Sequence, residues 1–277
     1  MEQLANVLYE ESRYDKAMTT YHQVYRQMKK GSWATKKDLA RLLSSIGDTH
    51  HQVSQYDSAK MYLHRARMLH QSTSEPAGAY VIDDLTMLAN TYLRTEALDS
   101  AEKFITLALK KGESLYGKQS GELEYILALA SRIAKKKQQF RKSIDYAKRA
   151  LKINVEQFGP HHLYTAQRMN TVGLVYREFG KMELAEKYFY RALKIKKNHY
   201  PAEKKSIYIG QYNLAVVLLR QNRTREAMDL LEKVRIYDRK IYPQGHPYRA
   251  YTYIQLARGH MDTGEMEPAL RNIRKAY

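Results

Sequence analysis

The chain has 277 residues, of which 44% are hydrophobic and 27% charged, and it contains no cysteine. This composition excludes a disulfide framework and a thiolate metal site, and the lack of any apolar run of about 18 residues predicts that no segment spans a membrane. With 47 lysines and arginines against 29 acidic residues, the formal net charge is +18, which favours acidic peptides, nucleic acid or an anionic membrane as partners. The first residues, MEQLANVLYEE, lack an apolar secretion signal, so we expect a cytoplasmic protein.

A helical hairpin recurs along the chain with a spacing of 42 residues and no insertions. In chain order, we place the repeats at about 1–37, 38–79, 80–121, 122–163, 164–205, 206–247 and a truncated 248–277. One face of each helix is apolar and has to be buried, and a hairpin alone cannot bury both of its faces. The pattern therefore predicts an all-α protein that forms a single array of seven stacked hairpins.

Small and large residues alternate at fixed positions of the repeat, which indicates how the helices pack. In the first helix, the small position holds Ala5, Gly47, Ala89, Ser131, Gly173, Ala215 and Ala257. In the second helix, it holds Ala17, Ala59, Ala101, Ser143, Ala185, Ala227 and Ala269. Large residues fill neighbouring positions: Leu4, Ile46, Leu88, Ala130, Val172, Leu214 and Leu256 in the first helix, and Tyr21, Leu63, Ile105, Ala147, Phe189, Leu231 and Ile273 in the second. We expect the small residues to let paired backbones approach closely while the large ones fill the space between hairpins.

The turn inside each hairpin also has a fixed position, which suits a left-handed backbone. It holds Ser12, Ser54, Glu96, Gln138, Gly180, Asn222 and Gly264. Glycine and asparagine adopt that conformation readily, whereas Glu96 and Gln138 fit the role less well.

The fourth repeat departs from the pattern. Ala130, Ala134 and Ala147 replace larger residues, and Lys135, Lys136 and Lys137 follow directly. We favour local repacking onto Leu127, Leu129 and Ile133. A basic hinge that contacts a ligand is the alternative.

The order of residues in VGLVY, the turn glycine and AEKYFYRAL resembles the tetratricopeptide repeat. The 42-residue period and the connections QFGPHH and IYPQGHP are similar to the long form of kinesin light chains and bacterial tetratricopeptide proteins. The resemblance covers the whole chain and implies an α-α superhelix, a right-handed solenoid. Because neither end carries a polar capping helix, we expect either a segment of a larger protein or a homodimer that covers its own ends.

No catalytic or cofactor motif is found in the sequence. It has no glycine-rich phosphate loop, G-x-S-x-G or H-E-x-x-H pattern. His50 and His260 occupy a position that holds tyrosine in other repeats, so we interpret them as packing residues, and His161, His162 and His246 as residues of the connections. We therefore predict no enzyme activity, no cofactor and no metal site within this segment.

The resemblance places ligand contacts on the first helix of each repeat, on the concave side of the array. Asparagines there would bond a peptide backbone, and arginines or lysines would hold carboxylates. The residues so predicted are Asn90, Arg94, Arg132, Lys135, Lys136, Asn170, Arg177, Tyr212, Asn213, Arg220, Tyr251 and Arg258. The groove as a whole is no more basic than the rest of the chain; only repeats three to six carry an excess of positive charge.

Three functions follow from this sequence. The leading hypothesis is a protein-interaction scaffold whose groove binds an extended or helical, acidic segment of a partner or of its own parent chain. A second is a regulatory or sensor arm of an enzyme, such as a protease or kinase, that lies outside the segment. The third is nucleic-acid binding driven by the positive charge, with bases stacked on Tyr125, Tyr212 and Tyr251.

Overall fold

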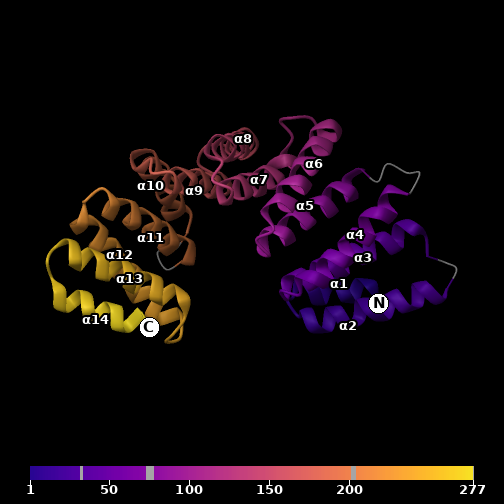
Figure 1. Cartoon of the computed structure of the whole chain (residues 1–277), viewed down its shortest axis with the longest axis horizontal. Helices are drawn as coiled ribbons and strands as arrows, with labels where there is room; N and C mark the ends of the chain where they lie inside the picture. The colour runs from indigo at the N-terminus through magenta and orange to yellow at the C-terminus, as the bar shows by residue number, and fades with distance from the viewer. Residues whose placement is uncertain (32–33, 73–77, 201–203, 277) are drawn as a thin grey trace. The chain divides into compact units, whose positions relative to one another are not determined.

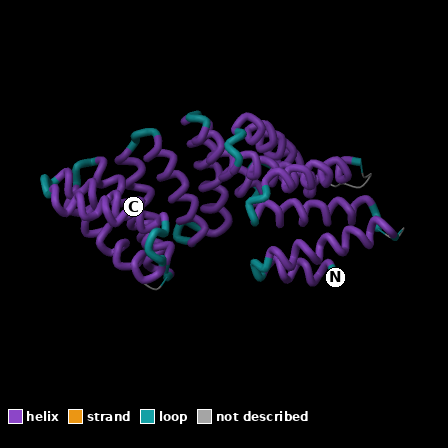
Figure 2. Tube along the Cα trace, turned by 60° about the horizontal axis from the view of Figure 1, so that its bottom comes forward, coloured by secondary structure: helices purple, strands orange, loops and turns teal. Residues whose placement is uncertain are grey.

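The computed structural model describes the whole chain except residues 32–33, 73–77, 201–203 and 277. The described part is built of α-helices and one short 3-10 helix and contains no strand (Figures 1 and 2). It forms two compact units, Met1–Gln139 and Phe140–Tyr277, which we call unit 1 and unit 2.

Unit 1 contains three helical hairpins and a further helix. Its elements are α1 (Glu2–Glu10), α2 (Tyr14–Lys30), α3 (Lys36–Gln52), α4 (Tyr56–Gln71), α5 (Gly78–Arg94), α6 (Leu98–Tyr116), the 3-10 helix η1 (Gly121–Leu123) and α7 (Glu124–Lys136). Unit 2 begins with a single helix that three hairpins follow. Its elements are α8 (Phe140–Phe158), α9 (Leu163–Glu178), α10 (Met182–His199), α11 (Lys205–Arg220), α12 (Thr224–Ile241), α13 (Pro247–Asp262) and α14 (Met266–Ala276).

The helices pack in the order in which the chain forms them, which confirms the predicted solenoid. The two helices of a hairpin contact each other, as α3 and α4 or α9 and α10 do, and each second helix then contacts the first helix of the next hairpin. The first helices also contact one another, α3 with α5 and α5 with α7 in unit 1, and α9 with α11 and α11 with α13 in unit 2. In each unit the first helices therefore form one shared face, which we call the first-helix face.

The predicted small positions are where the two helices of a hairpin approach most closely. A Cβ added to Gly173 would lie 2.6 Å from Phe189 Cε1, and one added to Gly47 would lie 2.7 Å from Leu63 Cγ. The alanines and serines at the other small positions are 0–3% exposed. Among the large positions, only Leu4 at 56% and Ile273 at 36% are exposed, in the first and last helices. Both predicted packing patterns are confirmed elsewhere.

The seven predicted turn residues all have the same backbone geometry. The predicted turn residues have φ between +56° and +78°, and Glu96 and Gln138 adopt it as fully as Gly180 does. In each turn the N–H of the next residue donates to the carbonyl five residues earlier at 2.8–3.0 Å, as Gln55 does to His50 and Lys181 to Tyr176. This bond is typical of the Schellman motif, which satisfies carbonyls that the helix end leaves open. A glutamate or glutamine thus takes the left-handed conformation because the surrounding packing requires it.

Helix α7 buries more of its surface than an amphipathic helix would. Leu127, Leu129 and Ile133 are at most 1% exposed, and Ala130 and Ala134 are also buried. The larger residues proposed to take over the packing of the fourth repeat are therefore buried together with the alanines of the regular positions.

The contact between consecutive hairpins includes pairs of side chains 14 residues apart. His70 on α4 and Asp84 on α5 form a buried pair, with 2.7 Å between Nδ1 and Oδ2, and Ser44 donates to the other Asp84 oxygen at 2.6 Å. At the equivalent positions of unit 2, Thr252 donates to Asp238 at 2.6 Å. These polar contacts were not predicted from the sequence, because polar side chains do not contribute to the apolar pattern that was used to assign buried positions.

Candidate functional site

Four of the predicted cationic residues line one hollow on the first-helix face of unit 1. Arg94 ends α5, and Arg132, Lys135 and Lys136 lie on the last turns of α7. Together with Tyr56, Leu93 and Glu96 they line a single concave site, which we call the basic hollow. The contact between α5 and α7 brings these side chains together, and their positions along the helices place them on the same face.

Arg132 and the exposed Lys136 leave part of the positive charge of the basic hollow available. Arg94 Nε donates to the Tyr56 hydroxyl at 3.2 Å, and Lys136 Nζ lies 3.0 Å from Glu96 Oε1. Arg132 is exposed and has no hydrogen bond or carboxylate partner in the described part of the chain. Hydrogen bonds with Ser54 and Arg94 lower the pKa of Tyr56. Four cations and one carboxylate thus meet here, which suits a ligand with several carboxylates.

The predicted asparagines of unit 2 bond to each other. Asn213 Nδ2 donates to Asn170 Oδ1 at 3.2 Å, and Arg177 Nη1 donates to Asn213 Oδ1 at 3.1 Å. Asn213 is buried, and burial lowers the pKa of Arg177. This polar ladder crosses from α9 to α11, so a peptide backbone would have to compete with contacts that already exist.

The other predicted polar residues are spread along the first-helix faces. In unit 1, Asn90 Nδ2 lies 3.3 Å from His51 Nε2. In unit 2, Arg220 ends α11 and Arg258 lies near the end of α13, and both are exposed. Neither of them lines the pocket between α11, α12 and α13.

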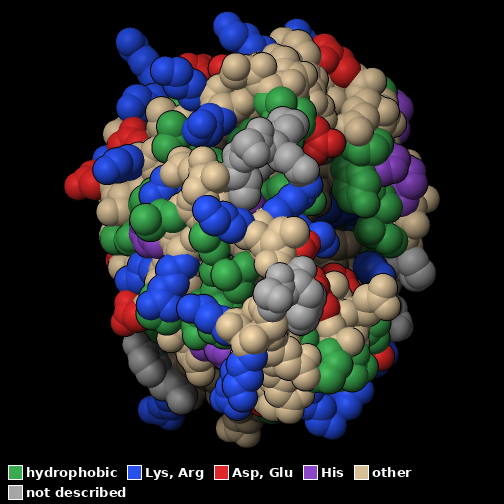
Figure 3. Space-filling model, turned by 90° about the vertical axis from the view of Figure 1, so that its right-hand side faces the viewer, with side chains coloured by type: hydrophobic (Ala, Val, Ile, Leu, Met, Phe, Trp, Pro, Cys, Tyr) green, Lys and Arg blue, Asp and Glu red, His purple; other side chains and the backbone are tan. Residues whose placement is uncertain are grey.

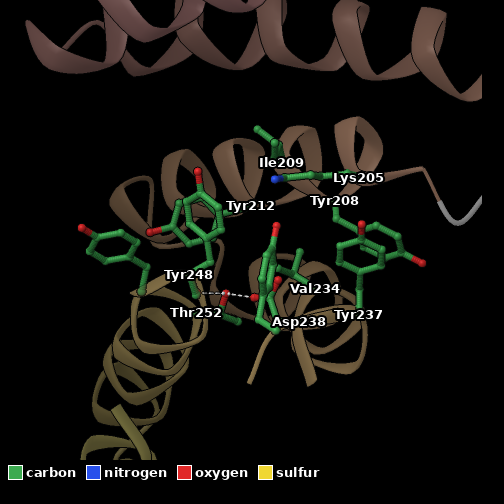
Figure 4. Close-up of a pocket in the computed structure, with 11 residues that line it drawn as sticks. Lys205, Tyr208, Ile209, Tyr212, Val234, Tyr237, Asp238, Tyr248 and Thr252 are labelled. Carbon is green, nitrogen blue, oxygen red and sulfur yellow. Dashed lines mark hydrogen bonds between the residues drawn. The ribbon is translucent and has the colours of Figure 1, made fainter. Parts of the chain in front are cut away.

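Tyr212 and Tyr251 line a pocket of about 180 Å³ in unit 2 (Figure 4). The pocket lies between α11, the end of α12 and the start of α13, and aromatic rings form most of its wall. The remaining lining residues are Lys205, Tyr208, Ile209, Val234, Tyr237, Asp238, Tyr242, Tyr248 and Thr252. We call this site the tyrosine pocket.

The rings of the tyrosine pocket contact one another and a lysine at the rim. Tyr208 and Tyr237 stack with centroids 3.9 Å apart, and Tyr242 meets Tyr248 edge-on at 5.2 Å. Lys205 Nζ lies 5.5 Å from the Tyr242 centroid and 5.3 Å from that of Tyr248, and its hydrogen bond with Tyr242 raises the pKa of the lysine. These distances are within the range of a cation–π contact.

Sequence reasoning missed four of the six tyrosines and Lys205. Tyr208 and Tyr248 lie on the same helices as Tyr212 and Tyr251, one helical turn away, so their spacing could have indicated a shared aromatic surface. Tyr237 and Tyr242 come from the second helix and the connection, which were assigned to packing and to the family turn. Only the fold shows that these parts of the repeat adjoin the first-helix face.

The histidines mostly have structural roles. His50 is 9% exposed, its Nδ1 lies 2.6 Å from Gln55 Oε1, and its ring stacks on Tyr62. His260 is only partly buried, and its Nδ1 lies 2.5 Å from Glu265 Oε2. His162 and His246 accept hydrogen bonds from backbone N–H groups at the starts of α9 and α13. The described residues contain no group of three potential ligands that could hold a metal ion.

The connections before α9 and α13 share an aromatic residue that stacks on a histidine. Phe158 stacks on His162 with centroids 5.0 Å apart, and Tyr242 stacks on His246 at 4.3 Å. The left-handed glycine lies at a different place in each, because Gly159 directly follows Phe158 with φ of +87°, whereas Gly245 lies three residues after Tyr242 with φ of +82°. The segments QFGPHH and IYPQGHP therefore have the same side-chain stack on different backbone turns.

Family models described as tetratricopeptide repeat match residues 122–198 and 211–248. The chain is a tetratricopeptide repeat protein. No curated protein sequence matches it significantly.

Several solved structures share the fold of this tetratricopeptide repeat protein at low sequence identity. BtubC from P. vanneervenii has a TM-score of 0.71 and 18% identity, over 85% of this chain and 94% of that one. A protein from Podosopora anserina, described as a kinesin light chain with nearly identical TPR-like repeats, has a TM-score of 0.62 and 16% identity, over 74% and 95%. Aspartyl phosphate phosphatase F from Bacillus subtilis has a TM-score of 0.68 and 14% identity, over 97% and 67%.

Tetratricopeptide repeat proteins use their stacked hairpins as scaffolds for protein partners, and the extended surfaces of such arrays suit this role. In this chain, none of the described helices is long and apolar enough to cross a membrane. Lysine and arginine side chains are spread over the face seen in Figure 3, with fewer acidic ones between them. A partner site therefore has to be identified from local clusters.

Proposed function

We propose that this protein is a scaffold that captures an acidic peptide segment on the first-helix face of unit 1. The observation that supports the proposal is the convergence of Arg94, Arg132, Lys135 and Lys136 on the basic hollow. Guanidinium groups bind carboxylates bidentately and lysines act as mobile point charges, so the hollow suits two or more closely spaced acidic side chains.

The existing contacts of the hollow would yield easily to such a ligand. The Lys136–Glu96 pair is 55% and 74% exposed, and exposed pairs of this kind contribute about 0–1 kcal/mol. A peptide carboxylate could therefore replace Glu96 at Lys136 with little loss, while Arg132 would gain its first partner. The rest of the face would contribute shape more than charge.

Acidic ligands would bind at this end of the face and not at the other. Around α1 and α3, the first-helix face presents Glu10 and Asp48 in a polar site lined by Asn6, Tyr9, Tyr21 and Ser45. Tyr9 donates to Asp48 at 2.6 Å, and Tyr21 donates to Asn6 at 2.6 Å. A segment that crosses unit 1 would thus place its acidic residues at α5 and α7.

The test uses fluorescein-labelled poly-glutamate of 12 residues, with poly-lysine of the same length as a specificity control. The variant Arg132→Glu/Lys136→Glu reverses two charges of the hollow. Its matched control, Lys110→Glu/Lys111→Glu, makes the same charge change within α6, where both lysines are exposed. We expect the hollow variant to weaken binding about tenfold or more, because it removes charge-assisted bonds worth about 1.5–3 kcal/mol each. Thermal unfolding should be similar in all three proteins. Equal losses in both variants would mean that net charge alone attracts the peptide and would refute the proposal.

A further inference from the structure

We propose that the tyrosine pocket of unit 2 is a second binding site, which holds a nucleotide with its base against the tyrosine rings and its phosphate at Lys205. This site lies in the other unit from the basic hollow and takes another class of ligand. It is therefore independent of the peptide-binding proposal.

The size and lining of the pocket fit one flat ring system. Its volume of about 180 Å³ is slightly larger than the roughly 150 Å³ cavity that holds benzene in an engineered protein core. Tyr248 and Tyr251 are 47% and 54% exposed, so their rings are accessible from solvent. Every nucleobase has a π-face, and stacking on aromatic side chains is the main contact of proteins that bind single strands.

The rim supplies positive charge next to the rings. Lys204 precedes α11 and Lys205 is its first residue, and both are exposed. Figure 4 shows the Lys205 side chain extending along α11, beside Ile209 and Tyr208. Asp238, the one carboxylate among the lining residues, is 6% exposed and accepts a hydrogen bond from Thr252. An approaching phosphate would thus meet an ammonium group at the rim, with the carboxylate buried beneath the rings.

The repeat fold does not require these tyrosines. One repeat earlier, the positions of Tyr208, Tyr212 and Tyr237 hold Ala166, Asn170 and Ile195. Ala166 and Ile195 are buried there, so smaller residues complete the packing at that point. Three large aromatic rings in the later repeat therefore have a purpose other than filling the core.

The lining favours a base over a peptide. A bound peptide needs partners for its backbone N–H and C=O groups, and side-chain amides usually provide them. No asparagine or glutamine lines the pocket, and Asn170 and Asn213 on the adjoining face bond to each other. Phenol hydroxyls and flat ring faces suit the edge and the face of a base.

The experiment measures binding of fluorescein-labelled oligo(U) and oligo(A) RNA of eight nucleotides, by polarisation at several salt concentrations. Unlabelled UMP and AMP serve as competitors. Three variants are compared with the unaltered chain: Tyr248→Leu/Tyr251→Leu, Lys205→Gln, and the control Tyr190→Leu, which changes a 60% exposed tyrosine on α10. Thermal unfolding verifies that each variant is folded.

We expect the double tyrosine variant to weaken binding about 5- to 150-fold per stacked base lost, with an unchanged salt dependence. Lys205→Gln should reduce the slope of log K against log salt by about 0.7, the contribution of one phosphate contact on a single strand. Competition by UMP or AMP near the affinity of the octamers would identify a free nucleotide as the ligand, and a strong preference for octamers would identify a single strand. Both support the site.

Three results would overturn the proposal. The first is no binding of RNA or mononucleotide at low salt. The second is an equal loss in Tyr190→Leu and in the double tyrosine variant, which would indicate a general effect of surface aromatics. The third is displacement of RNA from the pocket by poly-glutamate, with a loss of that displacement in the tyrosine variant, because the pocket would then be a peptide site. The charge-reversal variant Arg132→Glu/Lys136→Glu distinguishes the two proposals. When Tyr248→Leu/Tyr251→Leu is added to it, the fold-loss of RNA binding should be the same as in the unaltered chain.

Discussion

Replacing Gly173 by alanine tests the close contact between α9 and α10 in unit 2. The added methyl group would lie 2.6 Å from Cε1 and 2.7 Å from Cδ1 of Phe189, and real Cβ contacts are longer than 3.0 Å. Phe189 is 1% exposed, so its ring has no solvent into which it can turn. Helix α9 therefore has to move away from α10, or the ring has to leave its preferred rotamer.

Two opposing effects set the size of the change. Alanine is about 1 kcal/mol better than glycine in a helix interior, whereas overpacking a filled core costs about 1–3 kcal/mol. Because the clash is with a buried ring, we expect overpacking to prevail and Gly173→Ala to lower the free energy of unfolding by up to about 2 kcal/mol. Gly210 is the matched control, because a Cβ there meets Leu193 Cδ1 at 3.1 Å and no other atom closer than 3.7 Å. Gly210→Ala should leave stability unchanged or raise it by up to about 1 kcal/mol.

The third repeat provides a compensating change. At the equivalent positions it has Ala89 and Ile105, both at most 2% exposed. Phe189→Ile alone should be destabilising, but combined with Gly173→Ala it should show a favourable coupling of about 0.5–3 kcal/mol. Urea unfolding followed by circular dichroism measures all four proteins. A stabilising effect of Gly173→Ala, or independent effects of the two changes, would mean that the helices are farther apart than the structure places them.

Two further predictions concern the turns and the histidines of unit 1. Ser54 has φ of +63°, a conformation that costs about 1–2 kcal/mol for a residue with a side chain, so Ser54→Gly should stabilise the protein by about 1 kcal/mol. Gly180→Ala should destabilise it by about 1–2 kcal/mol for the same backbone reason, because a Cβ there meets no atom within 4 Å and causes no clash. Urea midpoints that shift in the opposite directions would contradict this. Burial lowers the pKa of His22, His51 and His64 below their usual 6.5, so the unfolded chain takes up protons before the folded chain as pH falls below about 6.5, and the urea midpoint should decrease from pH 7.5 to pH 5.5. A higher midpoint at pH 5.5 would show that these side chains are not buried as neutral groups.

The packing of the repeats could be predicted from the sequence because it depends on residue size at a fixed period. Gly173 and Phe189 follow from the 42-residue spacing alone, and so do the turn residues, even Glu96 and Gln138. Among the large positions of the repeat, the two exposed residues are Leu4 and Ile273, which lie in α1 and α14. Size and period thus determine the core wherever a neighbouring hairpin covers it.

The polar sites could be predicted only in part. The sequence placed Arg94, Arg132, Lys135 and Lys136 on the first helices, and the contact between α5 and α7 gathers them into one hollow. It could not show that Asn213 bonds to Asn170, because such contacts depend on rotamers and on how each hairpin is aligned with the next. The tyrosine pocket was also hidden, since its wall combines both helices of one hairpin with the start of the next.

The buried contact between consecutive hairpins keeps one backbone arrangement while its pair of side chains differs from repeat to repeat. Two positions 14 residues apart meet at this contact, and they hold Met28 and Leu42, then His70 and Asp84, and later Asp238 and Thr252. The same backbone arrangement thus accepts an apolar pair, an acid with an imidazole, and an acid with a hydroxyl. Stability alone does not explain this choice, because a buried ionic pair is often no better than an apolar pair of similar volume.

A single and a double substitution at the His70–Asp84 contact should have opposite effects on stability. Asp84→Ala should lower the free energy of unfolding by about 3–5 kcal/mol, since it leaves the His70 ring and its neighbours without the carboxylate. The pair His70→Met/Asp84→Leu copies the preceding hairpin contact and should be neutral or stabilising by about 1–4 kcal/mol. Ser44, which donates its one hydroxyl hydrogen to Asp84, also lies 3.1 Å from the Ala40 carbonyl and would donate to that oxygen once the carboxylate is removed. If the double variant loses as much as Asp84→Ala, the polar pair stabilises the contact. If it does not, the pair acts mainly by specifying which hairpins stack on each other. A hairpin that placed Leu42 against His70 or Asp238 would leave a buried polar group unpaired, so each hairpin favours its own neighbour.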